Sequence, residues 1–575
     1  MTCNTIDAIV DAIRPLLNVR PNDKFESHGK PFLHSLIAAA MATQSPITFV
    51  LPAFPCKSPN AIAEVLGTLP DRGEEMALAR LEAMCVAIEA VYPPGAVVRI
   101  FSDGRVFNKI LGVATDVVLA YKAALLELAA DCVHIEFDRL DNHTSSKDDP
   151  IEELKARYGV DVLDLDTHLA AHPGLCNTYR SFQTFLRQDL LHEFAVLDAE
   201  AKEAAVDAAA REMIRRNIAF SNLVADAYGS SIRLSIHAFD NAGPKFGVLL
   251  IPQLDGDVPT TPWHCVVCRN HDGTEFARKH EDVDRTKYAI VYKYGRPWCY
   301  EAKPELAPEW ETMDVRFEAW RQGLIITANG APPSLLDVPR AAVRAFATQY
   351  SLVVFRGFRQ DDDFEAVAAH LGEILTWPTG SIFELKQDDL EGLASRSREG
   401  LPFHYDGMFK RIPGTQTLGD VPLYQLFQCH QPYPDPEDAS NGRTLFVDTR
   451  RLLASLPATD VDRLRELAMT ATTPANVMYG SAELTHETSL IVHHPVTGCE
   501  VLRFHEPWGA DKTEGQPTTI AIVTKDGQRA SPEDEAWVLD TLVPLLYDHR
   551  MCYSHKWRRG DFVLSDNVSQ LHSRT

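Results

Sequence analysis

Apolar residues in the first half of the sequence recur at two alternating spacings. One spacing is helical and places apolar side chains on one face of each predicted helix, most clearly in segments 61–91, 116–130 and 193–216. The other is a short apolar run bounded by turn residues, which is typical of a buried strand and occupies 47–51, 97–101, 133–137, 232–237, 246–251 and 264–269. Because helices alternate with strands, the pattern predicts an α/β fold with a Rossmann-like, largely parallel layered sheet.

The second half is richer in short strands. A proline-rich stretch, 301–333, separates the two patterns, and after it a helix leads into the apolar run 352–357. Many short strands joined by turns are what a double-stranded β-helix, or jelly roll, requires. We therefore expect two domains, 1–325 and 326–575, the second a jelly roll with flanking helices.

Charge and composition narrow the range of partners. The 575 residues carry 56 basic and 80 acidic side chains, a net charge of −24, which disfavours nucleic acid and anionic membranes as partners. No run of 18 apolar residues is present, so no membrane span is expected. The N-terminus lacks the pattern of a secretory signal and the 11 Cys are scattered, which together favour a cytoplasmic protein with reduced thiols. The sequence does not decide the oligomeric state, and a homodimer stays open.

Three residues in the second half have the composition of an iron site. His404 and Asp406 are two residues apart, and on a strand residues at that spacing point to the same face. Both can therefore reach one ion, and His572 supplies a third ligand if the fold brings its strand alongside. Two His and one carboxylate, with the opposite side open, form the facial triad of non-haem Fe(II) oxygenases. Taken alone, His-x-Asp is a common tripeptide, so the surrounding sequence must decide whether these residues bind a metal.

Polar residues also collect at predicted strand ends in the first half. Lys57 stands between a strand and a helix, where free helix N–H groups favour an anion. Ser102, Asp103 and Arg105 follow the strand 97–101, and catalytic groups in open α/β sheets gather at such carboxyl ends. A third set is spread over later segments and comprises Arg233, His237, Lys245 and His264. Each residue also has a structural interpretation, because Ser-Asp-Gly is a turn signal and basic side chains are more often solvated or ion-paired than catalytic.

The segments around these residues resemble those of a known family. The sequence contains FPCKSPN, TLPDRGEE, SDGRVF, IRLSIH, GPKFGVLLIP and TPWH in this order. Together they are similar to the isocyanide (isonitrile) synthases that open fungal isonitrile pathways, over roughly residues 30–300. The resemblance implies that the α-amino group of an L-amino acid becomes an isonitrile, with ribulose 5-phosphate supplying the carbon and no metal taking part.

That chemistry gives the polar residues candidate roles. Attack of an amine on a ketone needs a base and a donor for the developing alkoxide. The sugar phosphate and the amino-acid carboxylate need cations. The residues that we expect to bind these charges are Lys57, Arg105, Arg233 and Lys245. The acid–base candidates are Ser102, Asp103, His237 and His264.

The second half resembles the TauD/TfdA-type Fe(II)/2-oxoglutarate dioxygenases over about residues 335–575. The resemblance rests on HYDG, then GRTLF, then SDN ahead of a distal His. It implies a double-stranded β-helix that holds Fe(II) through His404, Asp406 and His572 and consumes 2-oxoglutarate and O₂. Thr444 matches the position that helps to hold the 2-oxoglutarate carboxylate.

The sequence departs from this pattern at its end. TauD/TfdA-type enzymes pair the far carboxylate of 2-oxoglutarate with an arginine well beyond the distal His, and this sequence stops three residues after His572. Arg574 is too close to His572 to match that arginine. We therefore expect a C-terminally truncated domain that lacks closing strands and whose dioxygenase activity is in question.

Together the two halves predict an isonitrile biosynthesis enzyme. The first half would make an isonitrile from an amino acid, and the second would desaturate, decarboxylate or hydroxylate that product. One alternative is a 2-oxoglutarate-dependent hydroxylase of a small acid with a non-catalytic N-terminal binding domain. Another is a non-catalytic interaction protein that senses iron or 2-oxoglutarate. The sequence does not name the amino acid.

Overall fold

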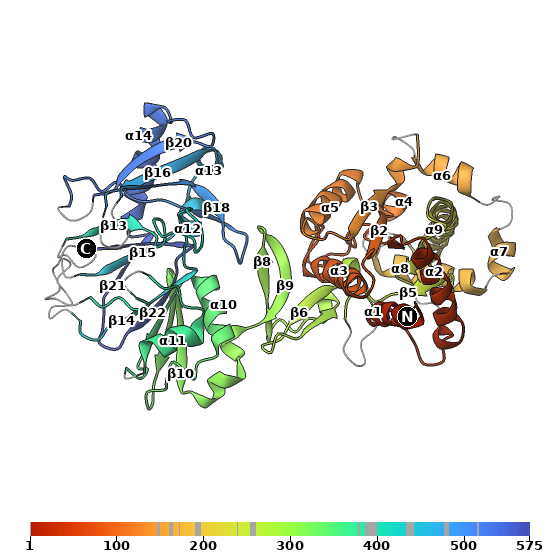
Figure 1. Ribbon diagram of the computed structural model, residues 1–575, viewed down its shortest axis with the longest axis horizontal. Coiled ribbons are helices and arrows are strands. Elements are labelled where there is room, and N and C mark those ends of the chain that lie inside the picture. Colours follow the sequence, from red (N-terminus) through yellow and green to blue (C-terminus); the bar gives the residue numbers. More distant parts are fainter. Residues whose placement is uncertain are drawn as a thin grey trace. The chain divides into compact units, whose positions relative to one another are not determined.

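The computed structural model divides the chain into two units (Figure 1). It describes residues 2–145, 150–159, 165–171, 173–189, 197–237, 240–252, 260–360, 362–377, 380–385, 399–432, 442–475, 482–513 and 517–575. Unit 1 comprises Met1–Val291 with Pro297–Glu301, and unit 2 comprises Tyr292–Arg296 with Ala302–Thr575. Residue 325, where the composition places the domain boundary, lies in a strand of unit 2 (β11, Gly323–Ala328).

A five-stranded parallel sheet organises unit 1. Its strand order is β3-β2-β1-β4-β5, which is the order of the first five strands in a doubly wound sheet. The strands are β1 (Ile47–Pro52), β2 (Ala96–Ser102), β3 (Ile135–Arg139), β4 (Ile232–Ser235) and β5 (Lys245–Gly247). A second sheet of order β7-β6-β9-β8 follows, made of β6 (Val266–Arg269), β7 (Glu275–Arg278), β8 (Tyr288–Lys293) and β9 (Arg296–Ala302).

Helices cover the parallel sheet. They are α1 (Thr2–Ile13), α2 (Lys30–Ala42), α3 (Arg72–Val91), α4 (Gly104–Phe107), α5 (Thr115–Leu128), α6 (Pro150–Tyr158), α7 (Leu165–Ala171), α8 (Pro173–Asp189) and α9 (Ala199–Ala227). Helix α9 packs on the sheet through Phe220, whose ring centroid lies 4.8 Å from that of Phe101 in β2. In Figure 1 strands β2 and β3 lie between α9 and α5. Of the helix predicted over 193–216, residues 193–196 lie outside the described part of the chain.

The helix predicted over 61–91 begins only at Arg72. The reason is a capping box: the Asp71 side chain accepts from Gly73 N–H at 2.9 Å, while the peptide N–H of Asp71 donates to Glu74 Oε2 at 2.9 Å. These bonds satisfy N–H groups that a longer helix would have used internally. Apolar spacing predicted the helix correctly, but the capping residues set where it starts.

Unit 2 is built on two larger sheets. One has the order β10-β11-β12-β22-β14 and the other β13-β23-β15-β21. The strands of the first are β10 (Val315–Trp320), β11 (Gly323–Ala328), β12 (Leu352–Arg356), β14 (Tyr424–Gln428) and β22 (Phe562–Asp566). Those of the second are β13 (Leu401–His404), β15 (Thr444–Asp448), β21 (Cys552–His555) and β23 (Gln570–Arg574). Consecutive strands β22 and β23 therefore belong to different sheets, as the strand-exchanging topology of a jelly roll requires.

Smaller elements complete unit 2. A three-stranded sheet has the order β17-β16-β20, with β16 (Leu467–Thr473), β17 (Leu484–Ser489) and β20 (Thr519–Thr524). A two-stranded ladder joins β18 (Ile491–His493) and β19 (Glu500–Leu502). The helices are α10 (Arg340–Tyr350), α11 (Phe364–Leu371), α12 (Thr449–Ser455), α13 (Ala458–Arg465) and α14 (Pro532–Leu546).

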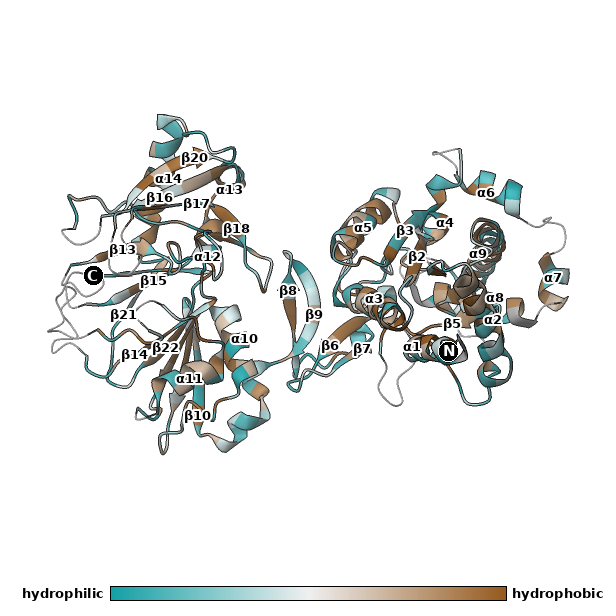
Figure 2. Cartoon of the chain, in the orientation of Figure 1, coloured by the Kyte–Doolittle hydropathy of each residue, from teal (hydrophilic) through white to brown (hydrophobic). Residues whose placement is uncertain are grey.

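Each unit has its own apolar interior. In unit 1 the buried face of α1, with Ile9, Val10 and Ile13, joins the sheet strands in one cluster. In unit 2 the interior is divided between clusters around Phe403 and Phe355. Figure 2 colours each residue by its hydropathy, and α6 is mainly hydrophilic in it. Within the described residues, no helix is both long and apolar enough to cross a membrane.

Candidate active sites

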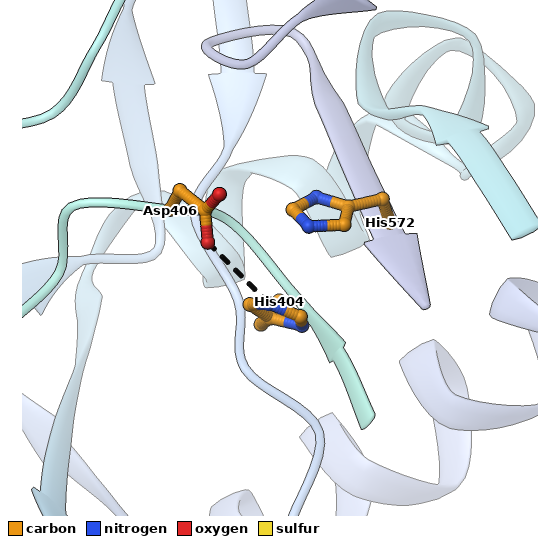
Figure 3. A group of neighbouring side chains, drawn as sticks. All are labelled: His404, Asp406 and His572. Atoms are coloured by element: carbon orange, nitrogen blue, oxygen red, sulfur yellow. Dashed lines mark ion pairs between the residues drawn. The ribbon is translucent and has the colours of Figure 1, made fainter. Parts of the chain in front are cut away.

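The three predicted metal ligands lie together in unit 2. His404 ends β13 and His572 is its antiparallel partner in β23, so the two imidazoles stand side by side with ring centroids 4.3 Å apart. Asp406 follows two residues after His404, and its Oδ1 lies 3.6 Å from His404 Nε2. One ligand atom from each residue falls within 4.8 Å of the others, and Figure 3 shows all three side chains converging. Such a set, two imidazoles and one carboxylate, fits a divalent transition-metal ion such as Fe(II).

The protonation states suit metal binding. His404 Nδ1 lies 2.8 Å from the carbonyl oxygen of Pro402, which fixes the proton on Nδ1 and leaves Nε2 free to bind a metal. Burial, with the neighbouring His404, lowers the pKa of His572 to about 3, so that ring is neutral at neutral pH. Burial alone would raise the pKa of Asp406, but His404, His572 and Gln425 together hold it below its usual range. His572 Nδ1 is buried and has no hydrogen-bond partner among the described residues, which is the kind of unsatisfied atom that a bound ion or ligand would engage.

Two further side chains hold Asp406 in place. Asn567 clamps its backbone: Asn567 Oδ1 accepts from the Asp406 N–H at 2.9 Å, and Asn567 Nδ2 donates to the Asp406 carbonyl at 3.0 Å. Gln425 on β14 donates from Nε2 to Asp406 Oδ2, the carboxylate oxygen that does not face His404. Gly407 follows with φ +95, and a Cβ there would lie 2.5 Å from the carbonyl oxygen of Asp420, so the turn requires glycine.

The residue predicted to hold 2-oxoglutarate lies on the metal face of the same sheet. Phe446 is the register partner of His572, and Thr444, two residues earlier on β15, is the partner of Arg574. Side chains two residues apart share a face, so Thr444, Arg574 and His572 point to the same side. Trp557 Nε1 donates to Thr444 Oγ1 at 3.0 Å, while Arg574 Nη2 donates to the carbonyl oxygen of Glu399 at 2.8 Å.

Lys57 lies in the interior of unit 1. Its ammonium group is 2.8 Å from Asp71 Oδ2 and 2.8 Å from Glu74 Oε2, and it donates to the carbonyl oxygen of Pro262 at 2.9 Å. The Lys57 side chain is 0% exposed, and all three of these contacts are to groups of unit 1 itself. These contacts link FPCKSPN, TLPDRGEE and TPWH in one buried network, and the anion-binding role of Lys57 stays a prediction.

The SDGRVF segment forms the carboxyl end of β2. Ser102 donates to the carbonyl oxygen of Phe54 at 3.0 Å, and Gly104 is required because a Cβ there would lie 2.1 Å from the carbonyl oxygen of Pro55. Between them, Asp103 Oδ1 is buried and has no hydrogen-bond partner among the described residues. Burial raises the pKa of Asp103 to about 7. Arg105 Nη1 lies 3.6 Å from Asp141 Oδ1.

Arg233 and Lys245 are brought together, as register partners on β4 and β5. Both reach Ser221 on α9: Arg233 Nη2 lies 3.2 Å from Ser221 Oγ, and Lys245 Nζ lies 3.0 Å from it. Burial and the adjacent Arg233 lower the pKa of Lys245 to about 8. The side chain of His237, two residues after the end of β4, is exposed.

His264 belongs to a different cluster. Its Nδ1 lies 2.9 Å from Glu64 Oε2, and Lys279 Nζ lies 2.5 Å from Glu64 Oε1. Burial opposes ionisation of Glu64, but these two partners outweigh it and lower the pKa of that carboxyl to about 2. His264 is thus paired with an ionised carboxylate, an arrangement that orients an imidazole for acid–base work.

Several residues around these sites carried no role in the sequence-based prediction. Asn567 stood in the SDN segment, but its contact with Asp406 spans 161 residues and has no local signal. Gln425 contacts Asp406 across 19 residues, and Ser221 contacts Arg233 and Lys245 across 12 and 24 residues. Asp71 caps α3 locally and also reaches back to Lys57. His505 is a third imidazole at the site and is buried, with its ring 5.9 Å from that of His404 and its Nδ1 2.7 Å from the carbonyl oxygen of Glu506.

Family models match both units. Residues 37–291 match the family described as pyoverdine/dityrosine biosynthesis protein, and residues 320–575 match the taurine catabolism dioxygenase TauD, TfdA family. The sheet topologies described above are those of an α/β unit followed by a sheet-rich dioxygenase unit.

Curated relatives match across both units. Isocyanide synthase xanB of Aspergillus fumigatus is 34% identical, over 92% of this chain and 73% of that protein. Isocyanide synthase A of the same organism is 31% identical, over 99% of this chain and 95% of that protein. Among solved structures, PvcA of Pseudomonas aeruginosa is 28% identical with a TM-score of 0.48, over 52% of this chain and 99% of that one. The chain therefore belongs to the isocyanide synthase family, with an isocyanide synthase unit fused to a TauD-type Fe(II)/2-oxoglutarate dioxygenase unit, as the sequence motifs predicted.

Proposed function

We propose that unit 1 converts the α-amino group of an L-amino acid to an isonitrile with ribulose 5-phosphate as the carbon donor. Unit 2 then desaturates, decarboxylates or hydroxylates that product. The observation that carries the proposal is the separation of two chemistries in one chain. The described part of unit 1 holds a cation pair without a carboxylate partner and a buried acid, Asp103, whose pKa lies near neutrality. Unit 2 holds His404, Asp406 and His572, which form the one candidate metal cluster among the described residues.

In unit 1 the chain's own groups suit condensation of an amine with a ketone. The amine must lose protons and the ketone oxygen must gain one. Asp103 fits this exchange, because a carboxyl with a pKa of about 7 can both accept and donate a proton at neutral pH. Arg233 and Lys245 supply positive charge for the substrate anions, and His264, held by Glu64, is a second acid–base candidate.

In unit 2 the residues would hold Fe(II) and aim the substrate. Fe(II), when bound with 2-oxoglutarate and O₂, supplies the oxidant that removes a hydrogen from the substrate. His404, Asp406 and His572 would hold that ion, and Thr444, which shares a sheet face with His572, would donate to the 2-oxoglutarate carboxylate. Trp557 fixes the Thr444 hydroxyl by donating to its oxygen, which leaves the hydroxyl hydrogen free for the ligand.

One experiment on the full chain tests the proposal. The protein is incubated with a panel of L-amino acids and ribulose 5-phosphate, first with a metal chelator and then with Fe(II), 2-oxoglutarate and O₂. We expect an isonitrile infrared band and the unoxidised isonitrile by mass spectrometry in the first reaction, and an oxidised product with succinate in the second. Turnover of 2-oxoglutarate with a small acid but no isonitrile would favour the hydroxylase alternative. Ligand binding without any turnover would favour the sensor alternative.

Replacing Asp103 with Asn should make unit 1 more stable and less active. Folding raises the pKa of this carboxyl, so between about pH 4 and pH 7 the folded chain keeps a proton that the unfolded chain has lost. The carboxyl therefore lowers the unfolding free energy as the pH rises, and the full cost is present above pH 7. Asn cannot ionise, and we expect Asp103→Asn to gain about 2 kcal/mol or more in unfolding free energy at pH 8, with little change at pH 4. Urea unfolding at both pH values measures this, and isonitrile formation should fall at least about 100-fold. Exposed Asp131→Asn is the control; an Asp103→Asn chain that keeps full turnover would remove Asp103 from the mechanism.

Gln425 is expected to tighten metal binding through Asp406. Its amide holds Asp406 Oδ2, so removing it frees the carboxylate to rotate. For Gln425→Ala we expect a 10- to 100-fold weaker apparent affinity for Fe(II) or Mn(II), roughly the effect of losing a partner to a metal ligand. Anaerobic metal titration is the measurement. Gln428→Ala is a matched control, because Gln428 lies on the same strand and donates instead to the carbonyl oxygen of Gln360; equal affinities in the two variants would contradict the assignment.

A further inference from the structure

Two cations in unit 1 face each other without a counter-charge from any carboxylate in the described part of the chain. Arg233 on β4 and Lys245 on β5 are register partners, so their side chains leave the same face of the sheet. Among the described residues neither forms an ion pair with a carboxylate, and no acidic group contributes to the pKa of either one. Arg99 provides the contrast: it occupies the same register row through Val50, yet it is paired with Glu136 at 2.5 Å.

A single hydroxyl joins the two cations. Ser221 Oγ accepts from Arg233 Nη2 at 3.2 Å and from Lys245 Nζ at 3.0 Å. Since both of these contacts use the oxygen as an acceptor, the hydroxyl hydrogen remains available to a ligand. The three residues thus present a guanidinium, an ammonium and a hydroxyl donor, with α9 contributing the third.

This arrangement is unfavourable unless an anion is present. Like charges on neighbouring strands repel each other, and partial burial raises the cost because water screens them less. The consequence is visible in Lys245, whose pKa falls to about 8 through burial and the charge of Arg233. The whole chain carries a net charge of −24, so a cation pair left without carboxylates stands out against its background.

We propose that Arg233, Lys245 and Ser221 form the subsite that binds the phosphate group of the sugar-phosphate substrate. The assignment rests on the proposed use of a sugar phosphate by unit 1. A phosphate dianion matches two positive charges and can accept several hydrogen bonds at once, whereas the carboxylate of an amino acid carries one charge. Lys57 and Arg105, the other cations predicted for this role, are paired with carboxylates instead.

Binding of inorganic phosphate to the full chain tests the subsite directly. Isothermal titration should show phosphate binding to the unsubstituted chain, weakened about 10- to 100-fold in Arg233→Met and in Lys245→Met, the range for losing a hydrogen bond to a charged group. Ser221→Ala should weaken binding by a smaller factor. Arg99→Met is the matched control, because Arg99 lies in the same row but is neutralised by Glu136. Equal phosphate affinity in all four variants and the unsubstituted chain, or no binding to any of them, would overturn the proposal.

Competition separates the two anions that the site could take. Inorganic phosphate should raise the KM for ribulose 5-phosphate competitively and leave the KM for the amino acid unchanged. In Arg233→Met and Lys245→Met the KM for ribulose 5-phosphate should rise by the same factor as the phosphate Kd. If phosphate instead competes with the amino acid, the cations bind its carboxylate and the proposal is wrong.

The same measurements distinguish the subsite from the proposed function. If the chain forms an isonitrile but phosphate neither binds nor competes, the subsite assignment fails and the function stands. If phosphate binding is lost selectively in Arg233→Met and Lys245→Met while no isonitrile is formed from any amino acid, the subsite stands and the proposed function fails.

Discussion

Asp406→Ala is expected to stop the second reaction while leaving the first intact. The substitution removes one of three ligand groups and opens the metal site to water, whereas Asp406 belongs to unit 2 and the isonitrile chemistry is assigned to unit 1. We expect the oxidised product to fall by at least about 100-fold, more than for the loss of a residue that merely orients a ligand. The unoxidised isonitrile should accumulate in its place. Mass spectrometry of both products, with metal content of the purified chain, measures the effect.

A matched control separates loss of a ligand from loss of a charge. Asp540 lies exposed on α14 and is not one of the candidate metal ligands. Asp540→Ala therefore removes an equivalent carboxyl group without changing the ligand set. It should oxidise the isonitrile at the unsubstituted rate. If Asp406→Ala retains both metal and oxidised product, the carboxylate is not a ligand and the assignment of the triad is wrong.

Lys57→Met should destabilise unit 1 severely. The substitution leaves Asp71 and Glu74, whose side chains are 2% and 0% exposed, without the charge that compensates them. Removing one partner of a buried ion pair costs about 3–5 kcal/mol, because the remaining charge is left desolvated. Chemical denaturation should therefore show an earlier transition for unit 1. Lowering the pH should restore part of the loss, since the orphaned carboxyls can then take up protons.

The control for this prediction is a lysine in an exposed pair. Lys24 lies 3.0 Å from Asp240, with side chains 58% and 54% exposed, and Lys24→Met should change stability by less than about 1 kcal/mol. A Lys57→Met chain with unchanged stability but a raised KM for ribulose 5-phosphate would reverse the conclusion. Such a result would support the substrate-binding role that the sequence predicted for Lys57.

The contrast between Lys57 and His404 explains which predictions a sequence supports. The His404-x-Asp406 spacing is local, so bringing both residues to one ion needed no knowledge of the fold, although β13 ends at His404 and Asp406 lies in the turn that follows rather than on the strand. That His572 pairs with His404 depends on β13 and β23 lying side by side, which only the family resemblance indicated. The internal partners of Lys57 were not predicted, because Asp71 and Glu74 follow 14 and 17 residues later, at the start of a helix whose orientation the sequence does not give.

The same limit applies to the element boundaries and the supporting residues. Helical spacing predicted α3, but Asp71 and Glu74 decided that it starts at Arg72. Gln425 contacts Asp406 from β14 and Asn567 contacts it from the turn between β22 and β23, and nothing in their immediate sequence marks them. Periodicity therefore predicted an α/β unit followed by a sheet-rich unit, and the family resemblance indicated the three candidate ligands together, whereas the contacts that hold Asp406 in place needed coordinates.

The position of β23 has a consequence for how the protein matures. β23 lies between β13 and β15, and it carries His572 shortly after the Asn567 that clamps Asp406. During translation β13 and β15 leave the ribosome first, and β23, the strand that pairs with both, follows more than a hundred residues later. Until then β13 and β15 expose unpaired edges, which invite mispairing with other nascent chains. The three candidate ligands can therefore come together only after β23 has been synthesised, and chaperone access in that interval should govern the yield of active enzyme.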